Sequence, residues 1–130
     1  MIFDDRRTLR TINDAPNSHI IKIFFYLAFN QPQDGISGLA IDKQQLQFDL
    51  KLGRTVFFES LHWLKDNLII HEIKNVDHSN FMVNPYIVMN NGDRNARIAE
   101  WSRRLKLDDA KIKRNRELKR RRELKKANQQ

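Results

Sequence analysis

The chain has 130 residues, a formal net charge of +8 and no cysteine. This length favours one domain with an appendage over two domains. The lack of cysteine excludes disulfides, zinc–thiolate sites and thiol catalysis, and it suits a reducing cytoplasm. The longest apolar run, Ile20 to Phe29, is broken by Lys22 and has only about half of the ~20 residues that a membrane helix needs. The N-terminus carries acids where a signal peptide needs an apolar stretch, so we expect a cytoplasmic protein with no membrane partner.

The positive charge lies at the C-terminal end. Up to Gly92 there are 9 Lys and Arg against 10 Asp and Glu, and from Asp93 onward there are 15 against 6. Such a segment is typical of proteins that bind a polyanion, because neutralising phosphates releases condensed counterions. The alternative is a tail that only keeps the protein soluble.

The first predicted helix follows an N-terminal arm, residues 1–17, which is expected to be irregular or to hold a short strand. Ser18 is a suitable N-cap, and the helix His19 to Asn30 carries apolar residues on nearly every side. A helix of this kind is expected to be buried all round, in the domain centre or partly in a subunit interface.

A second and a third helix follow at the spacing of a helix-turn-helix. Ile36 to Ile41 is short enough for a strand that pairs with a later hairpin, and Asp42 can cap a helix over Lys43 to Leu50. Gly53 is expected to take a left-handed conformation in the turn.

The third helix, Arg54 to Asp66, is expected to use one apolar stripe against the core. Its inward residues would be Phe57, Leu61, Leu64 and Leu68, with Asn67 closing the helix as a glycine often does.

The hydrophobic period then changes to two, which predicts strands at 69–74 and 81–83 around a polar loop. Helix, turn, helix and hairpin together predict an α+β fold of the winged helix-turn-helix type over residues 18–92. In that fold the second helix of the motif enters the major groove and the hairpin loop, or wing, lies along the backbone or minor groove.

Residues 93–130 are predicted to form a long basic C-terminal helix. Asn84-Pro85 should end the last strand, and Tyr86 to Met89 fits either a helical turn or a strand. From Arg94 the residues Ile98, Trp101, Leu105 and Ile112 form an apolar stripe that must be buried. Beyond Lys113 only Leu118, Leu124 and Ala127 are apolar, and we expect this end to fray or remain disordered without its partner.

The segment Asn80 to Gly92 resembles the RepL-type replication proteins of small bacterial plasmids. The resemblance rests on Phe81, Met82, Asn84, Pro85, Tyr86, Val88 and Gly92 after a helix-turn-helix, and it covers roughly residues 18–97. It implies binding to the plasmid's own origin and recruitment of host replication proteins. The Lys- and Arg-rich end has no counterpart in this resemblance.

Candidate DNA contacts fall into three groups. The first turns of the recognition helix reach base edges in such proteins, and phosphates are held by Lys and Arg. The expected groove contacts are Arg54, Thr55, Phe58, Glu59, His62 and Lys65, although Phe58 could instead be covered by the arm or a second subunit. The expected wing residues are Lys74, Asn75, His78, Ser79 and Asn80. The expected phosphate contacts are Arg103, Arg104, Lys113, Arg114, Arg116, Lys119, Arg120, Arg121, Arg122, Lys125 and Lys126.

Nothing in the sequence predicts catalysis, a cofactor or a metal ion. The glycines fit no phosphate-binding loop, and the four histidines lack metal-ligand spacing. A nicking enzyme needs a tyrosine beside a metal-binding histidine cluster, which neither Tyr26 nor Tyr86 has. We interpret both tyrosines, like Trp63 and Trp101, as packing residues.

The leading hypothesis is therefore a plasmid replication initiator that binds double-stranded DNA in a sequence-specific way and has no enzymatic activity. A winged-helix transcriptional regulator would use the same body. A third alternative is a protein- or RNA-binding module. A homodimer stays open, because the helix from Arg94 carries an apolar stripe, but Asp108 interrupts it where a coiled coil needs an apolar residue.

Overall fold

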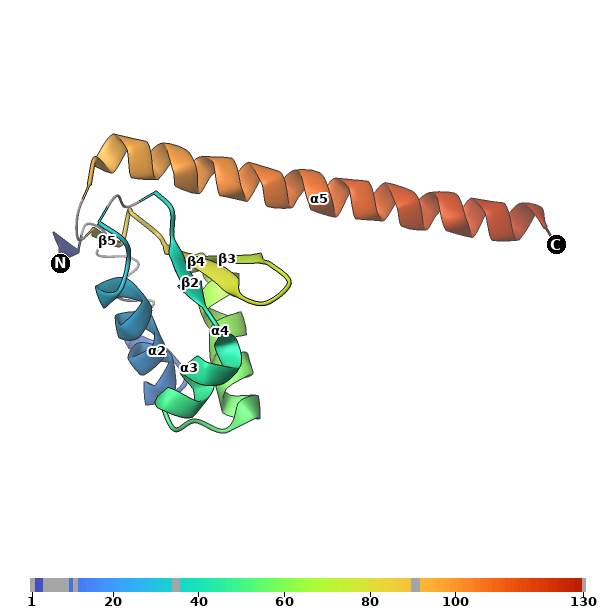
Figure 1. Cartoon of the computed structure of the whole chain (residues 1–130). Coiled ribbons are helices and arrows are strands. Elements are labelled where there is room, and N and C mark those ends of the chain that lie inside the picture. The colour runs from blue at the N-terminus through green and yellow to red at the C-terminus, as the bar shows by residue number, and fades with distance from the viewer. Residues whose placement is uncertain (1, 4–9, 11, 34–35, 90–91, 130) are drawn as a thin grey trace.

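A computed structural model describes residues 2–3, 10, 12–33, 36–89 and 92–129. The fold is α+β, with a small three-stranded antiparallel sheet, helices packed beside it and one long C-terminal helix (Figure 1). The elements in chain order are β1 (Ile2–Phe3), α2 (Ser18–Phe29), β2 (Leu39–Ile41), α3 (Lys43–Asp49), α4 (Arg54–Asp66), β3 (Ile70–Lys74), β4 (Ser79–Val83), β5 (Val88–Met89) and α5 (Arg94–Asn128).

The expected N-terminal arm contains a short strand. β1 pairs antiparallel with β5, so that Ile2 lies opposite Met89. Residues 4–9 and 11 of the arm lie outside the described residues. Ile12 is buried in the main core, so the end of the arm is part of the domain's packing.

Helix α2 lies in the centre of the domain but is not buried on every side. Its N-cap is Asn17, whose side chain accepts hydrogen bonds from the backbone amides of His19 and Ile20, so the predicted cap at Ser18 is wrong by one residue. Ile23 and Phe24 are fully buried, whereas Phe25 and Phe29 are exposed on the outer side. The domain itself therefore buries only one side of this helix, and burial of Phe25 and Phe29 in a subunit interface stays a prediction.

Helices α3 and α4 form at the predicted positions, but the turn between them differs. Asp42 caps α3 as expected. Gly53 has an extended conformation (φ −65°) and acts as the N-cap of α4, while Lys51 takes the left-handed conformation (φ 56°). The left-handed residue is thus two positions earlier than predicted.

Helix α4 buries Phe57, Leu61 and Leu64 and packs against α2. Leu68 was predicted on the same stripe, but it lies beyond the helix end, is 52% exposed and has a left-handed backbone (φ 55°). Asn67 caps the helix with a negative φ of −90°, so it does not take the place of a glycine.

The sheet has the strand order β2-β4-β3, all antiparallel. The predicted hairpin is therefore confirmed as β3 and β4, and the predicted strand before α3 pairs with β4 as β2. Gly38 takes a left-handed conformation (φ 70°), and a Cβ there would lie 2.2 Å from Asn80 Oδ1, so only glycine fits before β2. After Asn84 the chain turns into the short strand β5.

Helix α5 is capped by Asp93 and has 35 residues. Its first half packs on the body through Trp101, which is 3% exposed and lies edge-on to His71 of β3. His71 Nε2 is also 2.6 Å from Asp108 Oδ2, which joins α5 to β3. The second half extends beyond the body (Figure 1), is exposed throughout and is helical to Asn128.

The predicted apolar stripe of α5 is only partly buried. Ile98 and Leu105 are half-buried, and Ile112 is exposed. Two arginines, Arg97 and Arg104, contribute to the buried face instead.

Candidate nucleic-acid interface

The outer face of α4 gathers the residues predicted to contact a DNA groove. Arg54, Thr55, Glu59 and His62 are exposed, while the opposite face of the helix lies in the core. Gly53 at the N-cap leaves the first turn of α4 open, because no atom lies within 4 Å of the position of a Cβ there. The structure therefore brings these four side chains to one accessible surface.

Phe58 is half-buried beside these residues and is held between cations. Its ring lies edge-on to Phe57, with centroids 5.3 Å apart. The guanidinium of Arg54 and the ammonium of Lys43 lie 5.9 and 5.7 Å from the ring centroid. Contacts of this kind orient cations over aromatic rings. Phe58 thus positions Arg54, and the structure adds Lys43 to the set that was predicted from sequence.

Glu72 on β3 links the two helices to the hairpin. Its side chain is 2% exposed, and its carboxylate accepts hydrogen bonds from Lys43 at 2.7 Å, Lys65 at 2.9 Å and Ser79 at 2.6 Å. Burial alone would raise the pKa of Glu72, but the hydrogen bonds from Lys43, Lys65 and Ser79 outweigh it and lower the pKa from 4.5 to about 2. The carboxylate is therefore ionised at neutral pH and fixes the start of α3, the end of α4 and the hairpin relative to one another.

Three residues that were predicted to contact DNA are instead bound within the domain. The Lys65 ammonium is bound to Glu72, and Ser79 is buried with its hydroxyl on the same carboxylate. Asn80 is half-buried and donates to the backbone carbonyl of Ser37 at 2.7 Å. All three position the surface rather than extend from it.

The β3–β4 loop and the start of α3 enclose a groove of about 280 Å³ next to α4. Lys74, Asn75 and His78 of the predicted wing are exposed there. His78 lies 2.8 Å from Asp77, and this contact lowers the pKa of the Asp77 carboxyl. The groove is lined by Asp42, Lys43, Gln44, Phe58, Lys74, Asn75, Val76, Asp77, His78 and Ser79.

The second half of α5 presents most of the predicted phosphate contacts on its surface. Lys113, Arg114, Arg116, Lys119, Arg120, Arg121, Arg122, Lys125 and Lys126 are all exposed. Arg121 pairs with Glu117 at 2.9 Å, four residues before it. In Figure 1 this half extends past the body on the side toward which the β3–β4 loop points.

The two other predicted phosphate contacts lie in the first half of α5. Arg103 is exposed and binds Glu100 at 2.6 Å. The Arg104 side chain is only 4% exposed and binds the same carboxylate at 3.0 Å. Hydrogen bonds from Arg103 and Arg104 lower the pKa of Glu100 to about 2. Arg104 therefore faces the body of the domain and not the exposed surface of α5.

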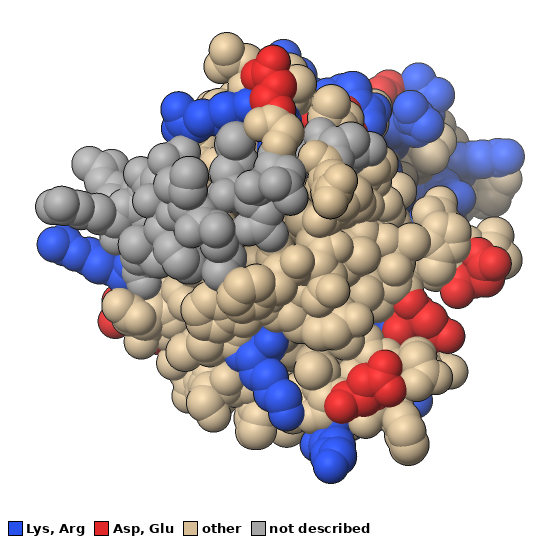
Figure 2. Space-filling view, turned by 60° about the vertical axis from the view of Figure 1, so that its left-hand side comes forward, with Lys and Arg blue, Asp and Glu red and all other residues tan. Residues whose placement is uncertain are grey.

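The charged surface has a contrasting side. Figure 2 shows a face on which most of the described side chains are uncharged, with Lys and Arg mainly along its margins. The exposed Phe25 and Phe29 of α2 have stacked rings 5.9 Å apart. Cations are thus distributed unequally around the molecule.

Within the described ranges, no three His, Asp or Glu side chains are placed to hold a metal ion together. No helix in the same part of the chain is both long and apolar enough to cross a membrane.

Comparison of the chain with protein-family models, curated proteins and solved structures finds no match.

Proposed function

We propose that the protein binds double-stranded DNA in a sequence-specific way as a winged helix-turn-helix protein without enzymatic activity. In this proposal α3 and α4 form the helix-turn-helix, α4 enters the major groove, and the β3–β4 loop is the wing. The second half of α5 contacts phosphates. The observation that carries the proposal is the exposed polar face of α4, with Arg54 at its first position and a buried stripe behind it.

The division of charge supports separate roles for the two surfaces. Arg54 at the start of α4 can donate two hydrogen bonds to a guanine edge, which gives base discrimination. From Lys113 onward the chain carries 9 Lys and Arg against 2 Glu on an exposed helix. Phosphate contacts from such a helix give affinity that depends on salt and carries little base information.

The experiment starts from a binding site selected from random duplexes with the full chain. Affinities for that site and a scrambled duplex are then measured by fluorescence anisotropy over a salt series. Arg54→Ala should weaken binding to the selected site by about 1–3 kcal/mol and leave the scrambled duplex almost unchanged. Lys106→Ala removes one exposed cation from α5 and is the charge-matched control.

Deletion of residues 113–130 should weaken binding to both duplexes alike. The slope of log K against log salt should become shallower by about 0.9 for each phosphate contact that is lost. Failure to select any preferred sequence at any salt would overturn the proposal. An unchanged site preference in Arg54→Ala would remove Arg54 from the base contacts.

A narrower proposal concerns the biological role. The resemblance of Asn80 to Gly92 to RepL-type proteins supports replication initiation at a plasmid origin, in the cytoplasm of a bacterial host. A plasmid that depends on this gene should be lost when Arg54→Ala replaces the wild-type protein. If the plasmid persists while transcription from a neighbouring promoter changes, the protein is a transcriptional regulator instead.

A further inference from the structure

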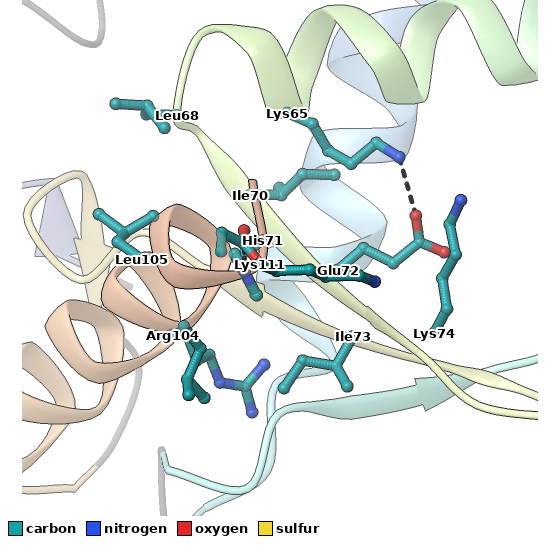
Figure 3. Close-up of a pocket in the computed structure, with 12 residues that line it drawn as sticks. Lys65, Leu68, Ile70, His71, Glu72, Ile73, Lys74, Arg104, Leu105 and Lys111 are labelled. Carbon is teal, nitrogen blue, oxygen red and sulfur yellow. Dashed lines mark hydrogen bonds and ion pairs between the residues drawn. The ribbon is translucent and has the colours of Figure 1, made fainter. Parts of the chain in front are cut away.

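A second groove lies between β3, the end of α4 and the first half of α5 (Figure 3). It has a volume of about 470 Å³. In Figure 3 the side chains of α5 approach the strand from one side and Lys65 of α4 from the other. The groove is lined by Lys65, Leu68, Ile70, His71, Glu72, Ile73, Lys74, Arg104, Leu105, Leu107, Asp108 and Lys111.

The floor of the groove is the outer edge of the sheet. β3 is at one end of the strand order β2-β4-β3, so that in the described part of the chain no strand lies beyond it. The amide of Asn84 donates to the carbonyl of Ile69, and the amide of Asn75 donates to the carbonyl of His78, both at 2.9 Å. Odd-numbered residues of β3 therefore direct their backbone groups toward β4.

In an antiparallel ladder the backbone groups of successive residues point to opposite sides. The N–H and C=O groups of Ile70, Glu72 and Lys74 consequently point away from β4, into the groove. Such an edge can accept another strand by backbone hydrogen bonding.

The walls of the groove combine apolar side chains with cations. Leu68 and Leu107 are each 52% exposed. Within the described residues, Lys74 and Lys111 form no ion pair. The groove thus offers both a contact for apolar side chains and a positive charge that is not neutralised.

The carboxylates at the groove already have partners. Asp108 is bound to His71 at 2.6 Å, and Glu72 is bound by two lysines and Ser79. Arg104 shares Glu100 with Arg103, and its buried Nη1 atom has no hydrogen-bond partner in the described structure. The local field therefore favours an anionic occupant.

We propose that this groove binds an extended acidic segment of a partner protein, which adds to β3 as a further strand. Its backbone pairs with Ile70, Glu72 and Lys74. Each of its two faces carries acidic and apolar side chains: the face toward α4 meets Lys74 and Leu68, and the face toward α5 meets Lys111 and Leu107. A strand of this kind lies about 4.8 Å from β3. A DNA duplex is much wider than one strand and offers no backbone amides, so the groove suits a peptide better than a nucleic acid.

The test uses the full chain and a labelled peptide of about ten residues that repeats Val-Val-Glu-Glu, so that the two-residue period of a strand gives each face both apolar and acidic side chains. Because this peptide can also bind the basic half of α5 by charge alone, a second peptide of identical sequence carries N-methyl groups at alternate residues. The modification keeps the charge but removes the backbone donors on one edge. The unmodified peptide should bind at least about tenfold more tightly, which corresponds to about 1.4 kcal/mol.

Variants of α5 locate the binding. Lys111→Glu should weaken peptide binding about tenfold, whereas Lys106→Glu makes the same charge change at an exposed position outside the groove and should have little effect. Leu107→Ser should also weaken binding, with Leu118→Ser beyond the body as its control. Hydrogen exchange should show slower exchange of the amides of Ile70, Glu72 and Lys74 when the peptide is bound.

Three results would overturn the proposal: no binding of the unmodified peptide, equal binding of the N-methylated peptide, or equal effects of Lys111→Glu and Lys106→Glu. Protection of the same three amides by a DNA duplex, rather than by the peptide, would assign the groove to the nucleic-acid interface. None of these results depends on whether α4 selects a DNA sequence.

Discussion

Replacement of Glu72 by Gln tests whether one buried carboxylate holds the proposed DNA-binding surface together. The side chain is 2% exposed and has three hydrogen-bond donors. The fall of its pKa from 4.5 to about 2 means that the fold favours the ionised form over the neutral form by about 3 kcal/mol. Gln resembles the neutral form, so Glu72→Gln should lower the free energy of unfolding at pH 7 by up to about 3 kcal/mol. A domain of this size has only about 5–15 kcal/mol in total.

The sign of the pH dependence follows from the direction of this change. A lowered pKa contributes stability that is complete above the unfolded value of 4.5 and is lost as the pH falls toward about 2. The difference between wild type and Glu72→Gln should therefore be constant near neutral pH and shrink between pH 4.5 and 2. The lowered pKa of Glu100 is common to both proteins and cancels in this difference.

The assay is urea unfolding followed by circular dichroism at several pH values. Glu59→Gln makes the same charge change on the exposed face of α4 and should alter stability by no more than about 0.5 kcal/mol. The reasoning is refuted if Glu72→Gln costs less than about 1 kcal/mol at pH 7, or if its cost does not decrease on acidification.

Three further substitutions examine individual elements. Gly53→Ser should raise the free energy of unfolding by about 0.5–1 kcal/mol, and with it the midpoint of thermal unfolding, because it adds a capping hydroxyl to α4 in open space. A lower midpoint would mean that this position needs a left-handed backbone. Trp101→Ala should cost about 3–5 kcal/mol in urea unfolding, because the indole is buried between α5 and the body, and a loss below about 1 kcal/mol would show that α5 is not packed there. Asp93→Ala should cost about 1 kcal/mol and reduce the helical signal through loss of the α5 cap; an unchanged signal and midpoint would contradict that assignment.

Elements defined by local pattern could be predicted well. The bounds of α4, Arg54 to Asp66, are the predicted ones, because the apolar stripe and the change of period after Asn67 are both visible in neighbouring residues. The start of α5 after Asp93 is also the predicted one, and the hairpin is present, although β4 begins at Ser79, two residues before the predicted strand.

Backbone conformations imposed by packing could not be predicted. Lys51 and Leu68 take left-handed conformations that sequence rules assign to Gly or Asn. In both cases the next packed element sets the angle at which the chain leaves a helix. The residue at the position that must be left-handed is then neither glycine nor asparagine. Gly53 and Asn67 were natural choices by residue type, and each lies within two residues of the observed position.

Buried ion pairs were the second feature that could not be predicted from the sequence. Glu72 and Lys43 are 29 residues apart in sequence, and His71 and Asp108 are 37 apart, so no local pattern indicates either pair. Arg104 looks like a surface cation in a basic helix, but its side chain faces the domain. The exposed set on α4 was easier to predict, because its position opposite the buried stripe follows from helical period alone.

The length of α5 gives the proposed complex a fixed scale. A helix rises about 1.5 Å per residue, so the stretch from Lys113 to Asn128 holds its cations along about 25 Å. Along one DNA strand phosphates recur about every 3.4 Å, so this length corresponds to about seven nucleotides. The length of the straight helix α5 therefore sets how far its phosphate contacts reach. The DNA footprint of one bound copy should extend further on one side of the bases contacted by α4 than on the other, and the number of residues in α5 determines the difference.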